Sequence, residues 1–69
     1  MRKGQVYTET VVLLAPERFA QEVPYQIAIV KLDEGESIAA RIEGERVAID
    51  DRVGETAVRD GISFFQKIL

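Results

Sequence analysis

The side chains that most often carry catalysis are missing from this 69-residue chain or lack their partners. It contains no cysteine and no histidine, which removes thiolate nucleophiles, tetrahedral zinc sites and imidazole bases together. Ser37 and Ser63 therefore have no histidine to activate them as in a hydrolytic triad. We predict that the protein is not an enzyme and that it has no catalytic residues and no cofactor.

Carboxylates are close together in two segments of the sequence, where they could bind a divalent metal ion weakly. Asp33, Glu34 and Glu36 surround a predicted hairpin turn, and Asp50 and Asp51 lie in a predicted loop. Neither group has the ordered oxygen spacing of a calcium loop. We expect solvated turns and no metal site.

Four cations on predicted strands form a candidate anion-binding set: Lys31, Arg41, Arg59 and Lys67. If their strands neighbour one another in register, they would suit the phosphates of coenzyme A or of an oligonucleotide. The alternative is a mixed-charge surface whose ion pairs contribute little stability, because carboxylates lie nearby in the sequence. Nine basic against twelve acidic residues give a net charge of −3, which disfavours nucleic acid as a partner.

An apolar row on the segment 25–32 is the candidate partner-binding surface. Both parities of "YQIAIVKL" are largely apolar, whereas a half-buried antiparallel strand alternates. We expect one parity to face the interior (Ala28, Val30, Leu32) and the other to lie outside and bind a partner (Tyr25, Ile27, Ile29). The alternative is that strand one or the C-terminal segment covers the outer row.

Phe19 is the fourth candidate partner-binding residue. It lies in a charged loop between Pro16 and Pro24. Its ring either plugs an end of the fold or stands exposed as an anchor, since aromatic residues surrounded by charge are enriched at contact hot spots.

The elements that position these residues are strands. Period-two patterning and β-propensity predict strands over residues 5–15, 25–32, 37–43, 52–59 and 62–68. Gly35 and the Asp60-Gly61 pair predict the two hairpin turns. Five strands in so short a chain close most readily into a barrel, because closure leaves no unpaired strand edges. We therefore predict an all-β, five-stranded antiparallel barrel, OB-fold-like or alternatively SH3-like, as a single domain over 1–69.

Four segments resemble the acyl-CoA-associated OB-fold domain of unknown function that usually follows a rubredoxin-like zinc ribbon. They are "GQVYTETVV", "APERF", "PYQIAIVKLDEG" and "IAARIEG". The resemblance implies a module bound to thiolase-like or other acyl-CoA enzymes. The ribbon's cysteines are absent, and Asp50 stands where the family commonly has glycine.

These observations together predict a non-enzymatic OB-fold module that acts by contact. Its partner would be a protein in an acyl-CoA context, either a thiolase-like or zinc-ribbon subunit, or a second copy of itself. The alternative is a single-stranded nucleic-acid-binding domain. No apolar run approaches the ~20 residues of a membrane helix, so we expect a cytoplasmic protein with no membrane partner.

Overall fold

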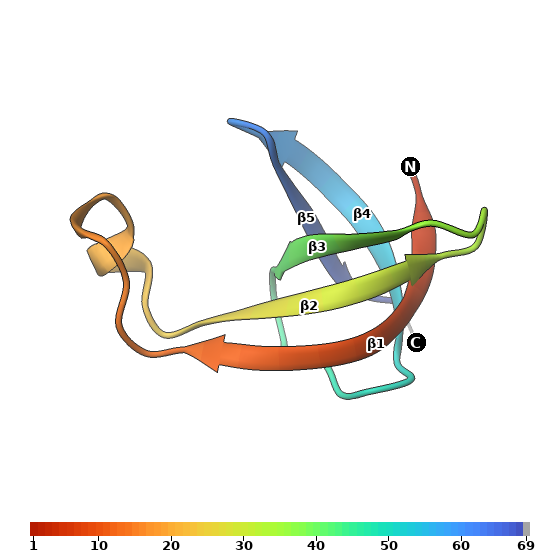
Figure 1. Cartoon of the computed structure of the whole chain (residues 1–69), viewed down its shortest axis with the longest axis horizontal. Coiled ribbons are helices and arrows are strands. Elements are labelled where there is room, and N and C mark those ends of the chain that lie inside the picture. Colours follow the sequence, from red (N-terminus) through yellow and green to blue (C-terminus); the bar gives the residue numbers. More distant parts are fainter. Residues whose placement is uncertain (69) are drawn as a thin grey trace.

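The computed structural model describes residues 1–68 and shows a closed barrel of five strands (Figure 1). The elements are β1 (Lys3–Val12), the 3₁₀ helix η1 (Glu17–Glu22), β2 (Tyr25–Leu32), β3 (Ser37–Ile42), β4 (Arg52–Arg59) and β5 (Ile62–Lys67). Around the barrel the strands follow the order β1-β2-β3-β5-β4. The predicted five-stranded all-β barrel is confirmed.

The sequence predicts that all neighbouring strands are antiparallel, but one pair in the structure is parallel. β3 and β5 run parallel, with Arg41 opposite Phe64 and Ile42 opposite Phe65. After β3 the chain crosses the end of the barrel, and the β4–β5 hairpin then brings β5 back alongside β3 in the same direction. This non-local pairing closes the barrel and leaves no local signal in the sequence.

The connection between β1 and β2 also differs from the prediction. β1 ends at Val12 rather than at Ala15, and η1 occupies the segment between the two prolines. Pro16 precedes this helix with a φ of −53°, and its carbonyl accepts a hydrogen bond of 2.8 Å from the Phe19 amide. Proline fixes φ in this range, so the chain turns here instead of continuing as a strand.

The core lies inside the barrel and follows strand alternation. On β2 the row of Ala28, Val30 and Leu32 is buried inside the barrel, as the sequence predicted, whereas the outer row is half-buried. Adjacent residues of a strand point to opposite faces, and Phe65 is accordingly buried whereas Phe64 lies on the outside. Within residues 1–68, the buried apolar residues of this core are Val6, Ala28, Val30, Leu32, Ala40, Ile42, Val47, Val53 and Phe65.

The turns use left-handed backbone at the predicted places. Asp60 and Gly61 have φ values of 53° and 78° in the β4–β5 turn, as a two-residue hairpin requires. Asp50 also has a positive φ, of 77°. Aspartate tolerates this region better than most residues.

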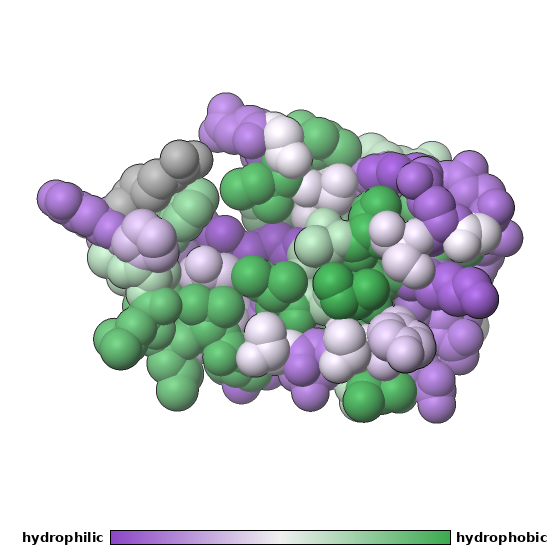
Figure 2. All heavy atoms as spheres, in the orientation of Figure 1, coloured by the Kyte–Doolittle hydropathy of each residue, from purple (hydrophilic) through white to green (hydrophobic). Residues whose placement is uncertain are grey.

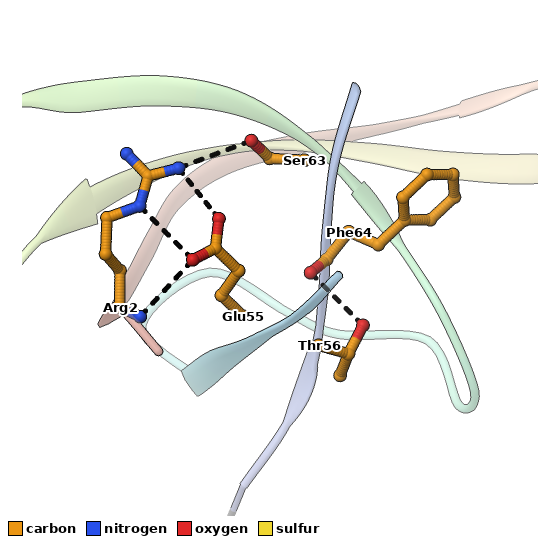
Figure 3. A network of polar contacts seen from close by, with 5 residues as sticks. All are labelled: Arg2, Glu55, Thr56, Ser63 and Phe64. Carbon is orange, nitrogen blue, oxygen red and sulfur yellow. Dashed lines mark hydrogen bonds and ion pairs between the residues drawn. The ribbon is translucent and has the colours of Figure 1, made fainter. Parts of the chain in front are cut away.

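Arg2 fastens the start of the chain to β4, where the barrel closes (Figure 3). Its carbonyl accepts a hydrogen bond from the Glu55 amide at 2.8 Å, and its Nη2 lies 2.7 Å from Glu55 Oε2 and 3.4 Å from Ser63 Oγ. The hydrogen bond from Arg2 lowers the pKa of Glu55 below its ordinary value. No helix within residues 1–68 is long and apolar enough to cross a membrane.

Candidate functional site

A groove of about 410 Å³ opens between the β1–β2 loop and the β4–β5 turn. Phe19 and Glu22 line it from the loop, Arg41 from β3, and Arg59 and Phe64 from the β4–β5 hairpin. A second hollow of about 260 Å³ continues from it over the outer face of β2 and β3. OB-folds bind their ligands on this face between these two loops, so the groove is the candidate site.

Arg41 is the centre of the groove. It lies on the outer face of the barrel, opposite Ile27 on β2 and Phe64 on β5. Despite this position its residue is only 7% exposed. A cation on the outer face is normally solvated, so the burial shows that neighbouring side chains cover it.

Aromatic rings and one carboxylate provide this cover. The Arg41 guanidinium lies 3.8 Å from the centroid of the Tyr25 ring, 5.4 Å from that of Phe19 and 5.7 Å from that of Phe64. Its Nη2 forms an ion pair with Glu22 at the end of η1. A guanidinium stacks on rings and binds carboxylates through the same planar group. Arg41 therefore holds the β1–β2 loop against the barrel.

A second arginine also stacks on Phe64. Arg59 lies 4.1 Å from the Phe64 centroid, and its Nη2 is 2.7 Å from Glu43 Oε2. The hydroxyl of Thr56 lies 2.5 Å from Glu43 Oε1 and 3.2 Å from the Phe64 carbonyl, the latter contact being drawn in Figure 3. Thr56 falls at a register shift in β4, and such irregularities redirect side chains.

This arrangement predicts a loss of stability in acid. The hydrogen bond from Thr56, and next the one from Arg59, lower the pKa of Glu43 below its ordinary value of about 4.5. A group with a depressed native pKa stabilises the fold above its unfolded pKa and loses that effect as the pH falls through the native pKa. We therefore expect the free energy of unfolding, measured with urea, to fall below about pH 4.5.

The Glu43→Gln variant isolates this carboxylate from the others. It should show a shallower decrease of stability in acid than the original chain, because the group that titrates is gone. Glu45→Gln is the matched control, since Glu45 is exposed and forms no ion pair among the described residues. Equal acid profiles for Glu43→Gln and the original chain would contradict the prediction.

The four cations predicted as an anion-binding set are divided by the structure. Arg41 and Arg59 both lie over the Phe64 ring, and each is paired with a carboxylate. Lys31 is exposed near the other end of β2, and Lys67 lies 3.8 Å from Asp51. The two arginines thus share a groove, whereas the two lysines lie outside it. Anion binding by any of them stays a prediction.

The four predicted partner-binding residues lie together. Phe19, Tyr25 and Ile27 line the hollow over β2 and β3, and Ile29 continues the same outer row. All four are half-buried rather than fully exposed. That they contact a partner stays a prediction.

The sequence analysis missed two neighbouring leucines at the start of the β1–β2 loop. Leu13 is 69% exposed and Leu14 is 91% exposed, and Figure 2 shows hydrophobic side chains gathered over this end of β1. The sequence contains a sign of this exposure, because both leucines follow an apolar strand and lie just before Pro16, where the chain turns. No group of three potential metal-ligating acidic side chains occurs within residues 1–68.

Comparisons with known proteins identify relatives of this barrel. The family model of the ChsH2 C-terminal OB-fold domain matches residues 1–57. A DUF35 domain-containing scaffold protein of Methanocaldococcus jannaschii is 50% identical over 40 residues, which cover 58% of this chain and 28% of that protein. A solved Ltp2-ChsH2(DUF35) aldolase has 25% identity and a TM-score of 0.75 over 99% of this chain and 58% of its own. The chain therefore spans about a quarter of the curated relative and over half of the solved one.

These matches correct one prediction and confirm another. The prediction that the protein is not an enzyme is contradicted, because the solved structure that resembles almost the whole chain is an aldolase. The absence of cysteine and histidine excludes thiolate and imidazole chemistry from this domain only. It does not exclude catalysis by an enzyme to which such a domain contributes. The resemblance to an acyl-CoA-associated OB-fold domain is confirmed. The chain belongs to the ChsH2 C-terminal OB-fold domain family.

Proposed function

We propose that this chain is an assembly module of an acyl-CoA enzyme, and that it docks a protein partner through the outer face of β2 and β3. The observation that carries the proposal is the apolar row of Tyr25, Ile27 and Ile29, which continues across to Ala39 on β3. We call these four residues the docking face.

The packing around this face supports a contact role. The interior parity of β2 supplies the core, so the outer row is not needed to fill the barrel. The adjoining hollow is lined largely by apolar side chains and backbone. Burying such side chains against a partner contributes about 1.5–3 kcal/mol each before the costs of association.

The relatives support the same proposal from a different direction. One of them is named a scaffold protein, and the other is an Ltp2-ChsH2 aldolase, a name that joins two components. A thiolase-like enzyme or a zinc-ribbon subunit encoded in the same genome is the partner that we propose. The groove beside Arg41 would then lie at the edge of the contact.

The test is binding of the purified chain to that thiolase-like enzyme, measured by titration calorimetry. We expect Ile27→Asp to weaken binding at least about tenfold, because it places a charge in a desolvated contact. Val58→Asp is the control, since Val58 is 59% exposed on β4, outside the docking face. Circular dichroism confirms that both variants are folded. Equal affinities for the two variants would count against the docking face.

Single-stranded nucleic acid is the second candidate ligand, favoured by the two arginines and three aromatic rings in the groove. Against it, each guanidinium already covers a ring and pairs with a carboxylate. Binding of a short oligonucleotide that weakens steeply with salt would favour this reading over the first.

A further inference from the structure

One edge of β1 is left open by the barrel. The first residues of β1, Lys3–Gln5, pair with β4. The amide and carbonyl of Val6 then form hydrogen bonds with the backbone of Asp51 and Asp50. From Thr8 to Val12, β1 pairs only with β2 among the described residues, and Tyr7 lies at the register shift that precedes this segment. Figure 1 shows β1 on the outside of this part of the sheet, with β2 beside it and β3 on the far side of β2.

An open edge of this composition is a template for another strand. Native proteins normally guard such edges with lysine, proline or inward charges. The segment "YTETVV" has one charged residue, Glu9, and its Oε1 accepts a hydrogen bond from Gln26 at 2.8 Å. The far edge of β2 is already paired with β3, so the edge of β1 is the one that can accept another strand.

Exposed apolar side chains stand at both ends of the open edge. Tyr7 (70% exposed) lies at its beginning, and Leu13 (69%) and Leu14 (91%) follow its end. Ile49 (57% exposed) precedes Asp50, whose amide bonds to the Val6 carbonyl, so it lies near the beginning. These are four of the seven large exposed hydrophobic residues among the described part of the chain.

We propose that two copies of this chain pair antiparallel along β1, with Thr10 of one copy opposite Thr10 of the other. In this register Tyr7 of each copy opposes Leu13 of the other, and Thr8 opposes Val12. Leu14 then lies beyond the paired segment, beside the loop that carries Ile49, because the backbone groups of Val6 are already bonded to Asp50 and Asp51. The contact is a symmetric interface in which the same patch serves both copies, and it places the exposed residues of one end against those of the other.

The neighbouring registers fit less well. Centring the pair on Glu9 would set two carboxylates opposite each other, which is destabilising. It would also place Leu13 opposite Gln5, whose edge is already occupied by β4. Centring the pair on Val11 would set Glu9 against Leu13. The Thr10 register sets Glu9 against Val11, but it is the one register of the three that joins Tyr7 to Leu13 and keeps the paired positions within Thr8–Val12.

Pairing in this way would also extend the outer surface of the sheet. Thr8, Thr10 and Val12 share the outer face with the row of β2 that they oppose. A symmetric pair therefore joins the outer faces of two barrels into one continuous sheet. This inference concerns the isolated chain and does not depend on the docking partner proposed above.

Cysteine cross-linking tests the register directly, because the chain has no cysteine of its own. Directly opposed Cβ atoms lie about 4.5–5.5 Å apart, close to the separation that a disulfide spans. Thr10→Cys should therefore form a covalent dimer under mild oxidation at least about ten times faster than Thr8→Cys. Two Thr8 residues would be four positions out of register, about 13 Å apart.

Oxidation of a mixture of two different cysteine variants tests the same register a second time. Thr8→Cys mixed with Val12→Cys should cross-link, whereas Thr8→Cys alone should not. Sedimentation of the original chain should show a dimer, and Leu13→Asp should weaken it at least about tenfold, since a charge would enter an apolar contact. A chain that stays monomeric at high concentration, or equal rates for Thr10→Cys and Thr8→Cys, would overturn the proposal.

Discussion

Replacing Gln26 with leucine is expected to lower the free energy of unfolding by about 3 kcal/mol, although leucine is the more apolar residue. Gln26 is 4% exposed and points into the barrel from β2. Its Oε1 accepts a hydrogen bond from the Val47 amide, and its Nε2 donates to the Val47 carbonyl, both at 2.8 Å. The same Nε2 also donates to Glu9 Oε1 at 2.8 Å.

The expected cost comes from the groups that leucine would leave behind. Val47 is itself 6% exposed, so its amide and carbonyl would lose their partners inside the core. Each buried polar group without a partner costs about 1–3 kcal/mol. A single hydrophobic core of this size rarely supplies more than about 3–5 kcal/mol in total. A substantial fraction of the Gln26→Leu protein should therefore be unfolded at room temperature.

Urea unfolding followed by circular dichroism measures this effect. Gln5→Leu is the matched control, because Gln5 is exposed on β1 and its Nε2 also donates to a backbone carbonyl, that of Asp50, at 3.1 Å. We expect the control to change stability by less than about 0.5 kcal/mol, as for most surface substitutions. Similar losses in the two variants would show that burial is not what makes the Gln26 hydrogen bonds important.

Local features of the fold could be predicted from the sequence because they depend on neighbouring residues. Turn residues such as Asp60 and Gly61 set the hairpins, and alternation identified which row of β2 faces inward. The parallel contact between β3 and β5 depends instead on how the whole barrel closes. Residues 43–51, which carry the chain across to β4, have no pattern that reveals their path.

The candidate site was only partly predictable for the same reason. Arg41 and Arg59 are 18 positions apart, and only the register of three strands shows that both lie over Phe64. Glu22 was missed because η1 was not expected. Phe64 and Phe65 are adjacent, so alternation places one of them on the outer face but does not show that two arginines lie over it. Burial of a charged residue on an outer face is a property of the folded surface alone.

Replacing Arg41 with lysine is expected to lower the free energy of unfolding by about 2 kcal/mol, although the charge is retained. An ammonium group is a compact point charge that cannot stack its plane on a ring. Lysine would therefore lose the close approach of 3.8 Å to Tyr25 and leave Phe19 and Glu22 with a weaker partner. Because those two residues belong to η1, the loop should loosen more than the barrel.

Two measurements separate loop release from general loss of stability. Urea unfolding reports the whole barrel, whereas cleavage by a glutamate-specific protease after Glu17 and Glu22 reports opening of the loop. Proteolysis of a transiently open state follows its population, so loosening by ~1.4 kcal/mol should speed cleavage about tenfold. Cleavage that accelerates no more than global unfolding predicts would contradict a specific role for Arg41 in holding η1.

Arg59→Lys is the matched control, because Arg59 also stacks on an aromatic ring and pairs with a carboxylate, yet its side chain is 56% exposed. Exposed ion pairs contribute about 0–1 kcal/mol, so this variant should lose less than half as much stability as Arg41→Lys and should leave loop cleavage unchanged. The difference between the two variants follows from desolvation: the same contacts are stronger where Phe19, Tyr25 and Phe64 exclude water. If the loop is held by Arg41, then a ligand or partner that competes for this guanidinium changes the shape of the groove, because the loop forms one of its walls.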